Sequence, residues 1–324
     1  MRAKHLCPVG VALLLTLVCV WTAAAGEKFP RRPVELIVPA APGGGTDIVA
    51  RILAEAAEPI LGQKVVVINK AGGSGTIGLH AITEATPDGH VLGCIYNSPL
   101  TMVPNVLRVK FTPDDFSYVT MLAKGPMLFA VRSEFPAKTA AEFFEVAGKS
   151  PGKYTYAGDG VGNIVHFAGE RVFQAKLVRL RLVPFGGAGE SMKALLGGHV
   201  NVYGGTVPPA VPHVKADKVR PLFVTSKERV EALPNTPGVK ELGKDVPETF
   251  IWRGILGPKG IPADRIAILE KAFQQAVQSE AVRSKLKDLG EVVAVAGGKE
   301  FERAVRDENA EMARVAMELG LSPK

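Results

Sequence analysis

The sequence predicts an α/β protein built from two halves, with the second half inserted into the first. Its 324 residues are enough for about two domains. Short apolar runs alternate with segments whose apolar residues recur at helical spacing, an order that favours parallel strands covered by helices. Two extended stretches, near 117–124 and 250–257, can carry the chain across and back. We therefore expect one discontinuous domain, 26–124 with 251–324, and a second domain at 125–250.

The first 25 residues have the features of a secretory signal peptide. Arg2 and Lys4 give a positive start, residues 9–21 form an apolar stretch, and small residues end at Ala25. The apolar stretch is too short to span a bilayer comfortably. We expect cleavage after Ala25 and release of the mature chain into the periplasm, with an uncleaved membrane anchor as the alternative.

The composition of the mature chain excludes several classes of protein. Cys94 is the one cysteine left after cleavage, so no intrachain disulfide can form and the core must hold the fold. No second apolar run approaches about 18 residues, which predicts a mature chain that is not embedded in a membrane. The leader holds two of the 39 basic residues, which leaves an excess of five over the 32 acidic ones. These charges are scattered, so they indicate mild attraction for anions and no nucleic-acid surface.

The first half repeats a strand–loop–helix unit. The apolar run 34–38 is bounded by prolines and predicts a buried strand. A glycine-rich loop follows, and Thr46 is the expected N-cap of an amphipathic helix that ends at Gly62. The further predicted elements of this half are strands at 64–68 and 91–96 and a helix at 77–86.

The remaining chain continues the alternation. We expect two extended runs within 116–131, separated by Gly125 and Pro126. Thr139 opens a capping box that begins a helix, and Asp264 is the expected cap of a long helix. The further predicted strands are 154–157, 180–184, 200–203, 220–225 and 250–256. The further predicted helices are 139–148, 163–174, 191–196, 264–290 and 301–319.

The most informative motif is the glycine loop at 40–47, AAPGGGTD, between the first strand and its helix. Glycines let backbone N–H groups face a ligand, and a helix N-terminus adds partial positive charge. Ligands of open α/β sheets bind beyond the carboxyl ends of the strands. Taken alone, the loop is either an anion site or a simple turn. Asp47, in the first helical turn, either competes with a bound anion or holds the loop.

A second glycine loop, 158–163, takes the matching place in the second half. It is not a dinucleotide motif, because Val165 stands where the last glycine of GxGxxG should be. Opposite the first loop, it can offer a second helix N-terminus to one ligand. Two further glycine stretches, 185–191 and 203–206, repeat the arrangement or serve as simple connections. His166, in the following helix, either approaches the ligand or has a packing or capping role.

The sequence has no complete catalytic or metal-binding motif. Phe143 stands where the first glycine of a Walker loop ending at Ser150 should be. The stretch 72–76 misses the G-x-S-x-G nucleophile elbow by its last residue. No two of the five mature histidines have the i,i+4 spacing of a helical zinc site, and one cysteine cannot supply the rest. We therefore expect no enzymatic activity, no cofactor and no metal.

Several short motifs follow one another along the mature chain. They are FPRRPVELIVP running into PGGGTD at 29–47, LGQ with VVV at 61–67, TPDG at 86–89, PGK at 151–153, LLGG at 195–198, VTS at 224–226, and Trp252 with Gly254 and Pro258. Their combination resembles the Bug/TctC family, the extracytoplasmic solute receptors of tripartite tricarboxylate transporters. The resemblance covers essentially the whole mature chain.

This resemblance implies a two-domain periplasmic binding protein of the Venus-flytrap, type II-like fold, with each domain a mainly parallel sheet flanked by helices. Family members typically hold a small organic acid or amino acid in the cleft through main-chain groups and bridging waters. The loops 40–47 and 158–163 correspond to those that hold the carboxylate. The receptor then delivers its ligand to a membrane permease, and we expect the mature protein to be a monomer.

The sequence departs from the family pattern in its loops. Ala40 stands in place of the usual phenylalanine, and Asp159 supplies a carboxylate that would repel an anion if it faced inward. Phe185 and Gly186 replace the usual tyrosine and lysine, and Asn201 replaces the usual aspartate. The second-domain pocket is therefore expected to be atypical.

The expected ligand contacts come from the glycine loops and from a few residues near them. The residues expected to contact the ligand are Ala40, Pro42, Gly43, Gly44, Gly45, Thr46, Asp47, Ser98, Gly158, Asp159, Gly160, Gly162, Asn163, His166, Gly186, Gly204 and Thr206. Two other functions stay open: a ligand-sensing partner of a signalling ectodomain, and an exported enzyme acting on a phosphorylated substrate. Trp252 lies in the return crossing and either reports hinge bending or is a core residue far from any moving part.

Overall fold

The computed structural model describes residues 28–321, and the predicted signal peptide at 1–25 lies outside them. Ten strands form one sheet. They are β1 (Val34–Val38), β2 (Val65–Asn69), β3 (Val91–Tyr96), β4 (Phe116–Arg132), β5 (Thr155–Gly158), β6 (Arg181–Pro184), β7 (Val202–Thr206), β8 (Val219–Val224), β9 (Phe250–Pro258) and β10 (Val292–Gly297).

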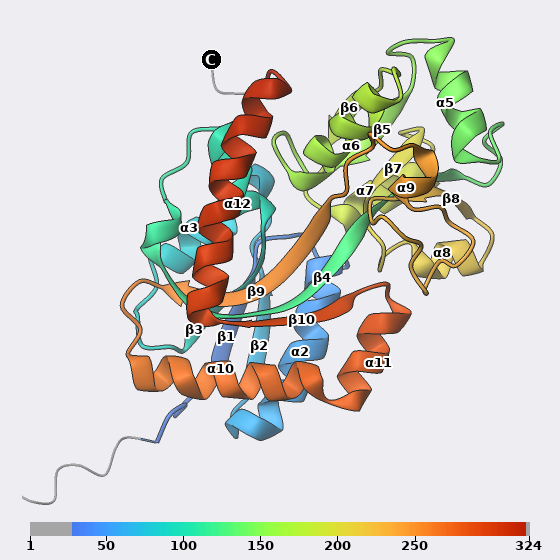
Figure 1. Cartoon of the computed structure of the whole chain (residues 1–324). Helices are drawn as coiled ribbons and strands as arrows, with labels where there is room; N and C mark the ends of the chain where they lie inside the picture. Colours follow the sequence, from blue (N-terminus) through green and yellow to red (C-terminus); the bar gives the residue numbers. More distant parts are fainter. Residues whose placement is uncertain (1–27, 322–324) are drawn as a thin grey trace, which may run out of the picture.

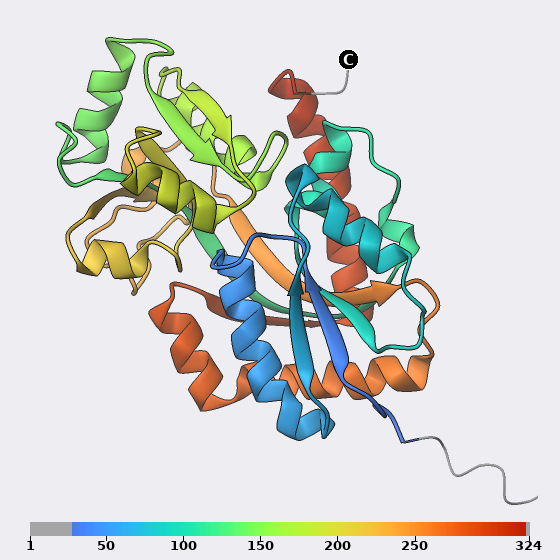
Figure 2. The same ribbon diagram turned by 180° about the vertical axis from the view of Figure 1, so that it is seen from behind.

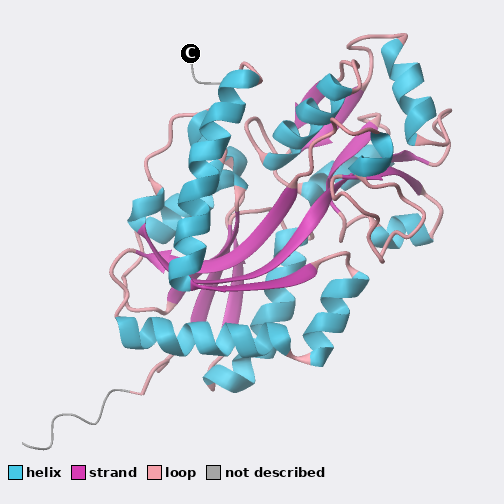
Figure 3. Cartoon of the chain, viewed as in Figure 1, coloured by secondary structure: helices cyan, strands magenta, loops and turns pink. Residues whose placement is uncertain are grey.

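Helices flank this sheet in both lobes of the molecule (Figures 1 and 3). They are α2 (Gly45–Leu61), α3 (Thr76–Thr83), α4 (Ser98–Thr101), α5 (Ala140–Gly148), α6 (Ile164–Ala175), α7 (Ala188–Leu196), α8 (Val211–Lys215), α9 (Val239–Leu242), α10 (Ala263–Gln278), α11 (Glu280–Asp288) and α12 (Gly298–Glu318). The first lobe contains β1–β3, β10, α2–α4 and α10–α12. The second lobe contains β5–β8 and α5–α9.

Each lobe has its own set of parallel strands. In the first lobe β1 lies between β2 and β3, and in the second lobe β5 lies between β6 and β7. The two sets are joined by β9 and β4, which run antiparallel to their neighbours, while β8 and β10 also pair with β4. The predicted α/β class is confirmed, but the sheet as a whole is mixed because the connecting strands reverse direction (Figure 2).

One continuous strand crosses between the lobes, where the sequence predicted two runs within 116–131. β4 has 17 residues and passes through Gly125 and Pro126 without a break. Its pairing with β9 ends at Pro126↔Phe250, and from Met127 onward it pairs with β7 and β8. The proline falls where the strand changes partners, so its missing N–H is tolerated. The Gly–Pro step therefore marks the passage from one lobe to the other.

The cores follow the predicted apolar periodicity. Val49, Leu53 and Ala57 recur along one face of α2 and are fully buried, and this helix packs against β1, β2, α10 and α11. In the second lobe Phe129 of β4 stacks on Phe223 of β8 with ring centroids 4.9 Å apart. Phe129 and Phe223 come from strands that are distant in sequence, so their contact holds the second-lobe part of β4 to β8.

Two predicted caps are each displaced by two residues. Gly44, with an extended backbone, is the N-cap of α2, so Thr46 is the second helical residue and not the cap. Glycine adopts helical geometry without a side-chain clash, which lets the helix begin earlier. Pro262 precedes α10, and Asp264 lies in the first turn, where its carboxylate complements the helix dipole. The predicted cap at Thr139 is confirmed: its side chain accepts the Glu142 N–H at 3.2 Å.

Trp252 belongs to the core of the first lobe while its backbone lies at the crossing. It pairs with Lys124 of β4. The indole packs edge-on against Phe301 of α12, with ring centroids 5.0 Å apart, and its N–H donates to Glu308 at 2.7 Å. The ring is therefore buried and its N–H has a partner, in a strand that crosses between the lobes.

The structure also bears on the lone cysteine of the mature chain and on membrane-spanning helices. Cys94 in β3 is free and fully buried, and burial raises the pKa of its thiol to about 12, so it is unreactive. Among the described residues, the helices are all too short or too polar to cross a membrane.

The close packing of β9 against α12 generates a stability prediction. A Cβ at Gly254 would lie 2.6 Å from Cε1 of Phe301 and 3.0 Å from the Thr120 carbonyl oxygen. Gly254→Ala should therefore lower the free energy of unfolding by about 1–3 kcal/mol, as overpacked cores do. The matched control is Gly148→Ala at the end of α5, where the nearest atom to a Cβ is 3.9 Å away. Urea denaturation of both variants measures this, and equal stabilities would contradict the packing described.

Candidate functional site

Four strand-to-helix connections meet where the two lobes face each other. In the first lobe they are residues 39–44, between β1 and α2, and Asn97, between β3 and α4. In the second lobe they are residues 159–163, between β5 and α6, and 185–187, between β6 and α7. All four follow the carboxyl ends of parallel strands, the edge at which open α/β sheets bind ligands.

Asp47 holds the first loop in place. Its carboxylate accepts the Gly43 N–H at 2.8 Å, pairs with Arg51 at 2.9 Å and accepts the Asn69 amide at 2.9 Å. The Asn69 amide also donates to the Ala40 carbonyl at 3.1 Å. Burial alone would raise the pKa of Asp47, but these hydrogen bonds outweigh it and lower the pKa. Of the two predicted roles for Asp47, the structure therefore supports the holding role.

The start of α2 lies against the second lobe. An ideal Cβ at Gly45 would overlap the side chain of Thr206, at the end of β7, and lie 2.9 Å from Nη2 of Arg253. A Cβ at Gly44 would lie 3.9 Å from the Ala188 nitrogen, at the start of α7. The missing side chains thus allow two helix N-termini from different lobes to come together, which concentrates partial positive charge.

The third loop, rather than the predicted second loop, lies directly opposite the first. A Cβ at Gly189 would lie 2.9 Å from the Pro42 carbonyl oxygen, and one at Gly187 would lie 3.2 Å from the Ala41 nitrogen. The N–H of Gly186 donates to Glu190 at 2.9 Å, so this predicted site residue helps to shape the turn.

The second loop contacts a different part of the first lobe. The Ile164 N–H, at the start of α6, donates to Ser98 Oγ at 2.8 Å, and the Asn163 amide donates to the Tyr96 hydroxyl at 3.2 Å. Ser74 donates to the Val161 carbonyl at 3.0 Å. Ser98 and Asn163 are therefore brought together as predicted, although each already contacts the opposite lobe.

The other predicted residues of this region stabilise the loop or the strand packing. His166 Nδ1 accepts the Gly162 N–H at 3.2 Å, which is the capping role left open from the sequence. Gly160 has φ +112° and packs closely on Ser74. Gly158 and Gly204 lie in strands, where a Cβ would press against Val165 of the second-lobe core.

The carboxyl of Asp159 lies close enough to both lobes to act on titratable groups of each. Burial raises the pKa of its carboxyl to about 7, the Ser191 hydroxyl partly offsets this, and the charge of Glu190 adds to it. Burial and then the charge of Asp159 raise the pKa values of Tyr96, from the first lobe, and of Tyr203. A carboxyl with a pKa near neutrality is protonated for part of the time, so it can donate to an anion instead of repelling it.

Sequence reasoning missed several residues at this junction. Buried polar atoms without a hydrogen-bond partner among the described residues include those of three predicted residues, Asp159 Oδ1, Asn163 Oδ1 and Thr206 Oγ1. They also include the Nε and Nη2 of Arg253, which was not predicted. Ser191 ends the glycine stretch 185–191 but was not expected to contact the ligand. Arg253 carries a sequence signal, because it is a charged residue inside the otherwise apolar run 250–256.

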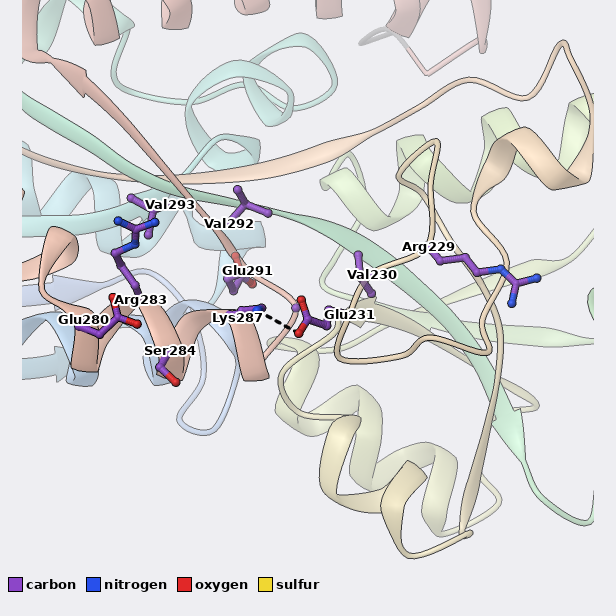
Figure 4. A pocket seen from close by; sticks show the side chains of 11 residues that line it. Arg229, Val230, Glu231, Glu280, Arg283, Ser284, Lys287, Glu291, Val292 and Val293 are labelled. Atoms are coloured by element: carbon purple, nitrogen blue, oxygen red, sulfur yellow. Dashed lines mark ion pairs between the residues drawn. The ribbon is translucent and has the colours of Figure 1, made fainter.

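A separate cavity of about 670 Å³ lies beside the crossing strands (Figure 4). It is bounded by residues 229–231 of the second lobe and by α11 and the start of β10 in the first lobe. Lys287 and Glu231 form an ion pair of 3.0 Å across it. No predicted site residue lines this cavity, but Glu291 does, and the Glu291 carboxylate pairs with Arg253.

No cluster of three potential ligands for a metal ion occurs within residues 28–321.

The family model described as the tripartite tricarboxylate transporter family receptor matches residues 49–321. The chain belongs to this family. The resemblance seen in the motifs is thereby confirmed, and the protein is a periplasmic solute-binding receptor of the TctC/Bug type.

Individual relatives agree with this assignment. The receptor is 34% identical over 264 residues to a UPF0065 protein in the gbd 5' region of Cupriavidus necator, covering 81% of this chain and 80% of that one. The solved structure of the periplasmic binding protein BugD is similar with a TM-score of 0.87 and 31% identity, covering 91% of this chain and all of the other.

Two similar structures contain ligands. MatC from Rhodopseudomonas palustris with bound malate has a TM-score of 0.82 and 28% identity, covering 89% of this chain and 99% of that one. An R. palustris protein with adipate has a TM-score of 0.87 and 27% identity, covering 91% and 100%.

The raised pKa of Asp159 predicts how the stability of the receptor depends on pH. An unfolded aspartate titrates near 3.9, so between about pH 4 and 7 the folded state binds more protons and stability falls as pH rises. Asp159→Asn removes this dependence. The variant should gain about 2–4 kcal/mol relative to wild type between pH 4 and pH 8.

Urea denaturation across that pH range measures the difference. The exposed Asp245→Asn is the matched control and should follow wild type at every pH. A constant offset between Asp159→Asn and wild type from pH 4 to 8 would show that the carboxyl is not buried as described.

Proposed function

We propose that this receptor captures a small carboxylate, an organic acid or an amino acid, between its two lobes and delivers it to a tripartite tricarboxylate-type permease. The observation that carries the proposal is the meeting of the α2 and α7 N-termini across the lobes. Helix N-termini are natural sites for carboxylates because their first N–H groups lack partners within the helix. The buried, unpartnered Oγ1 of Thr206 lies beside this junction and needs a polar partner.

The ligands of two similar solved structures support this ligand class, since malate and adipate are both dicarboxylates. The ligand contacts predicted from the sequence are kept in this proposal at residues 43–47, Ser98, Asp159, Asn163 and Thr206. Residues 187–191 are added, because the third loop faces the first.

The domain boundaries form part of the same proposal. Residues 26–124 with 251–324 and residues 125–250 act as two domains that close on the ligand by bending at the strand crossings. The change of partners at Gly125–Pro126 supports this hinge. We further propose cleavage after Ala25, export to the periplasm, and action as a monomer that binds its ligand without converting it.

Binding without chemistry is tested first with a panel of succinate, malate, adipate and aspartate. A ligand at 100 times its Kd stabilises the fold by about 2.7 kcal/mol, which raises the Tm by roughly 3–6 °C for a chain of this size. At least one acid should give such a shift, and NMR should show the acid unchanged after prolonged incubation. No shift with any carboxylate, or turnover of the acid, would overturn the proposed function.

The contact between the start of α2 and the second lobe is tested by Gly45→Ala. The added Cβ would overlap Thr206 of the opposite lobe, while Gly45 has an ordinary backbone conformation that alanine also adopts. Affinity for the acid should therefore fall about tenfold or more, equivalent to at least about 1.4 kcal/mol. Calorimetric titration measures the loss against Gly148→Ala, which should bind as wild type does. Unchanged affinity in Gly45→Ala would place the site elsewhere.

A further inference from the structure

A charged residue is buried in β9 with only part of its hydrogen-bonding capacity used. Arg253 has no exposed surface, although its neighbours in the strand are apolar. Its Nη1 donates to the carboxylate of Glu291, which directly precedes β10 and is also buried. The Nε and Nη2 groups have no hydrogen-bond partner among the described residues.

The two unpartnered groups are suited to one kind of partner. Nε and Nη2 lie on the same edge of the planar guanidinium, and their spacing matches the two oxygens of a carboxylate. A buried cationic donor without a partner costs free energy, so this edge requires an acceptor. Glu291 already satisfies the other side of the group and balances its charge, which makes the burial of Arg253 tolerable.

The unpartnered edge is directed at the beginning of α2. Nη2 lies 2.9 Å from the position that a Cβ of Gly45 would occupy, and Thr206 Oγ1, itself unpartnered and buried, is a close neighbour of the same position. The side chain of Arg253 comes from the first lobe and that of Thr206 from the second. A cationic edge, a hydroxyl and the N-terminus of a 17-residue helix thus converge on one point.

We propose that Arg253 is a specificity-determining anchor for one carboxylate group of the ligand, held ready by Glu291 and completed by Thr206 when the lobes meet. This inference rests on the proposed carboxylate-binding function and deepens it. The N-terminus of α2 alone attracts any anion, whereas a planar bidentate edge selects a carboxylate over its amide, because an amide offers one acceptor oxygen and presents an N–H₂ to the cation.

The test uses the mature receptor and calorimetric titration with succinate, malate, adipate and aspartate, and with succinamate, the monoamide of succinate. Arg253→Met/Glu291→Leu removes both charges together, since apolar replacement of a buried ion pair commonly preserves folding. Its control, Arg306→Met/Glu302→Gln, removes an exposed ion pair on α12. Circular dichroism and thermal melts establish that both variants fold.

The double variant should bind the acids that wild type binds at least about tenfold more weakly, and should lose the preference for succinate over succinamate. The control should match wild type. Glu291→Gln keeps an acceptor oxygen for Nη1 and removes the negative charge that balances the guanidinium, so affinity for the acids should rise above that of wild type. This second variant provides the answer if the double variant does not fold.

Affinities of the double variant within twofold of wild type would overturn the inference and show that an ordered water or the fold alone satisfies the guanidinium edge. Unchanged or weaker affinity in Glu291→Gln would also overturn it, because that result indicates a purely structural ion pair. If wild type binds none of the acids, the proposed function itself fails and the inference fails with it. Binding by wild type with loss in the double variant alone supports both.

Discussion

The antiparallel pairing of β4 with β9 determines where every other part of this receptor lies. β4 contributes one segment to the sheet of each lobe, and β9 returns beside it to the first lobe. The parallel strands of both lobes are attached to this pair, with β3 beside β9 and β7 beside β4. Because parallel strands carry their connecting loops at their carboxyl ends, this arrangement makes the glycine loops of the two lobes face each other.

Glycines in the facing loops let the two lobes approach closely, and buried polar side chains lie next to them. At Gly45 and Gly189 a Cβ would collide with the opposite lobe, so the N-termini of α2 and α7 can approach only in the absence of side chains. Polar atoms of Asp159, Asn163 and Thr206 are buried between the lobes without hydrogen-bond partners among the described residues. Desolvated polar groups cost free energy until a partner satisfies them, and this is the physical basis of the affinity that we propose for a small polar molecule. Asp159 adapts to this environment because burial raises its pKa to about 7.

Local sequence patterns predicted most of the fold. Strands 34–38 and 91–96 coincide with β1 and β3, because apolar runs bounded by turn residues determine strands locally. The break expected at Gly125–Pro126 was wrong, because partner exchange along β4 is a tertiary property that no local pattern contains. The caps at Thr46 and Asp264 were wrong for a smaller reason: several residues near a helix start can satisfy its N–H groups, and packing selects among them.

The candidate site was harder to predict than the fold. The first loop was identified because glycine, a helix start and a strand end occur in one stretch at 40–47. Which loop of the second lobe faces it depends on how the lobes are rotated about β4 and β9, and this is why the sequence favoured the loop 158–163 over the stretch 185–191. Arg253 was visible as a charge in an apolar strand, but its partner Glu291 is 38 positions away in sequence.

The most direct measurement of this account is a crystal structure of the mature receptor with the acid that binds it most tightly. One carboxylate of the acid should lie within hydrogen-bond distance of the N–H groups in the first turn of α2, with protein contacts from both lobes. Density for the acid in the cavity beside α11 (Figure 4), or on the outer surface of one lobe, would contradict the account.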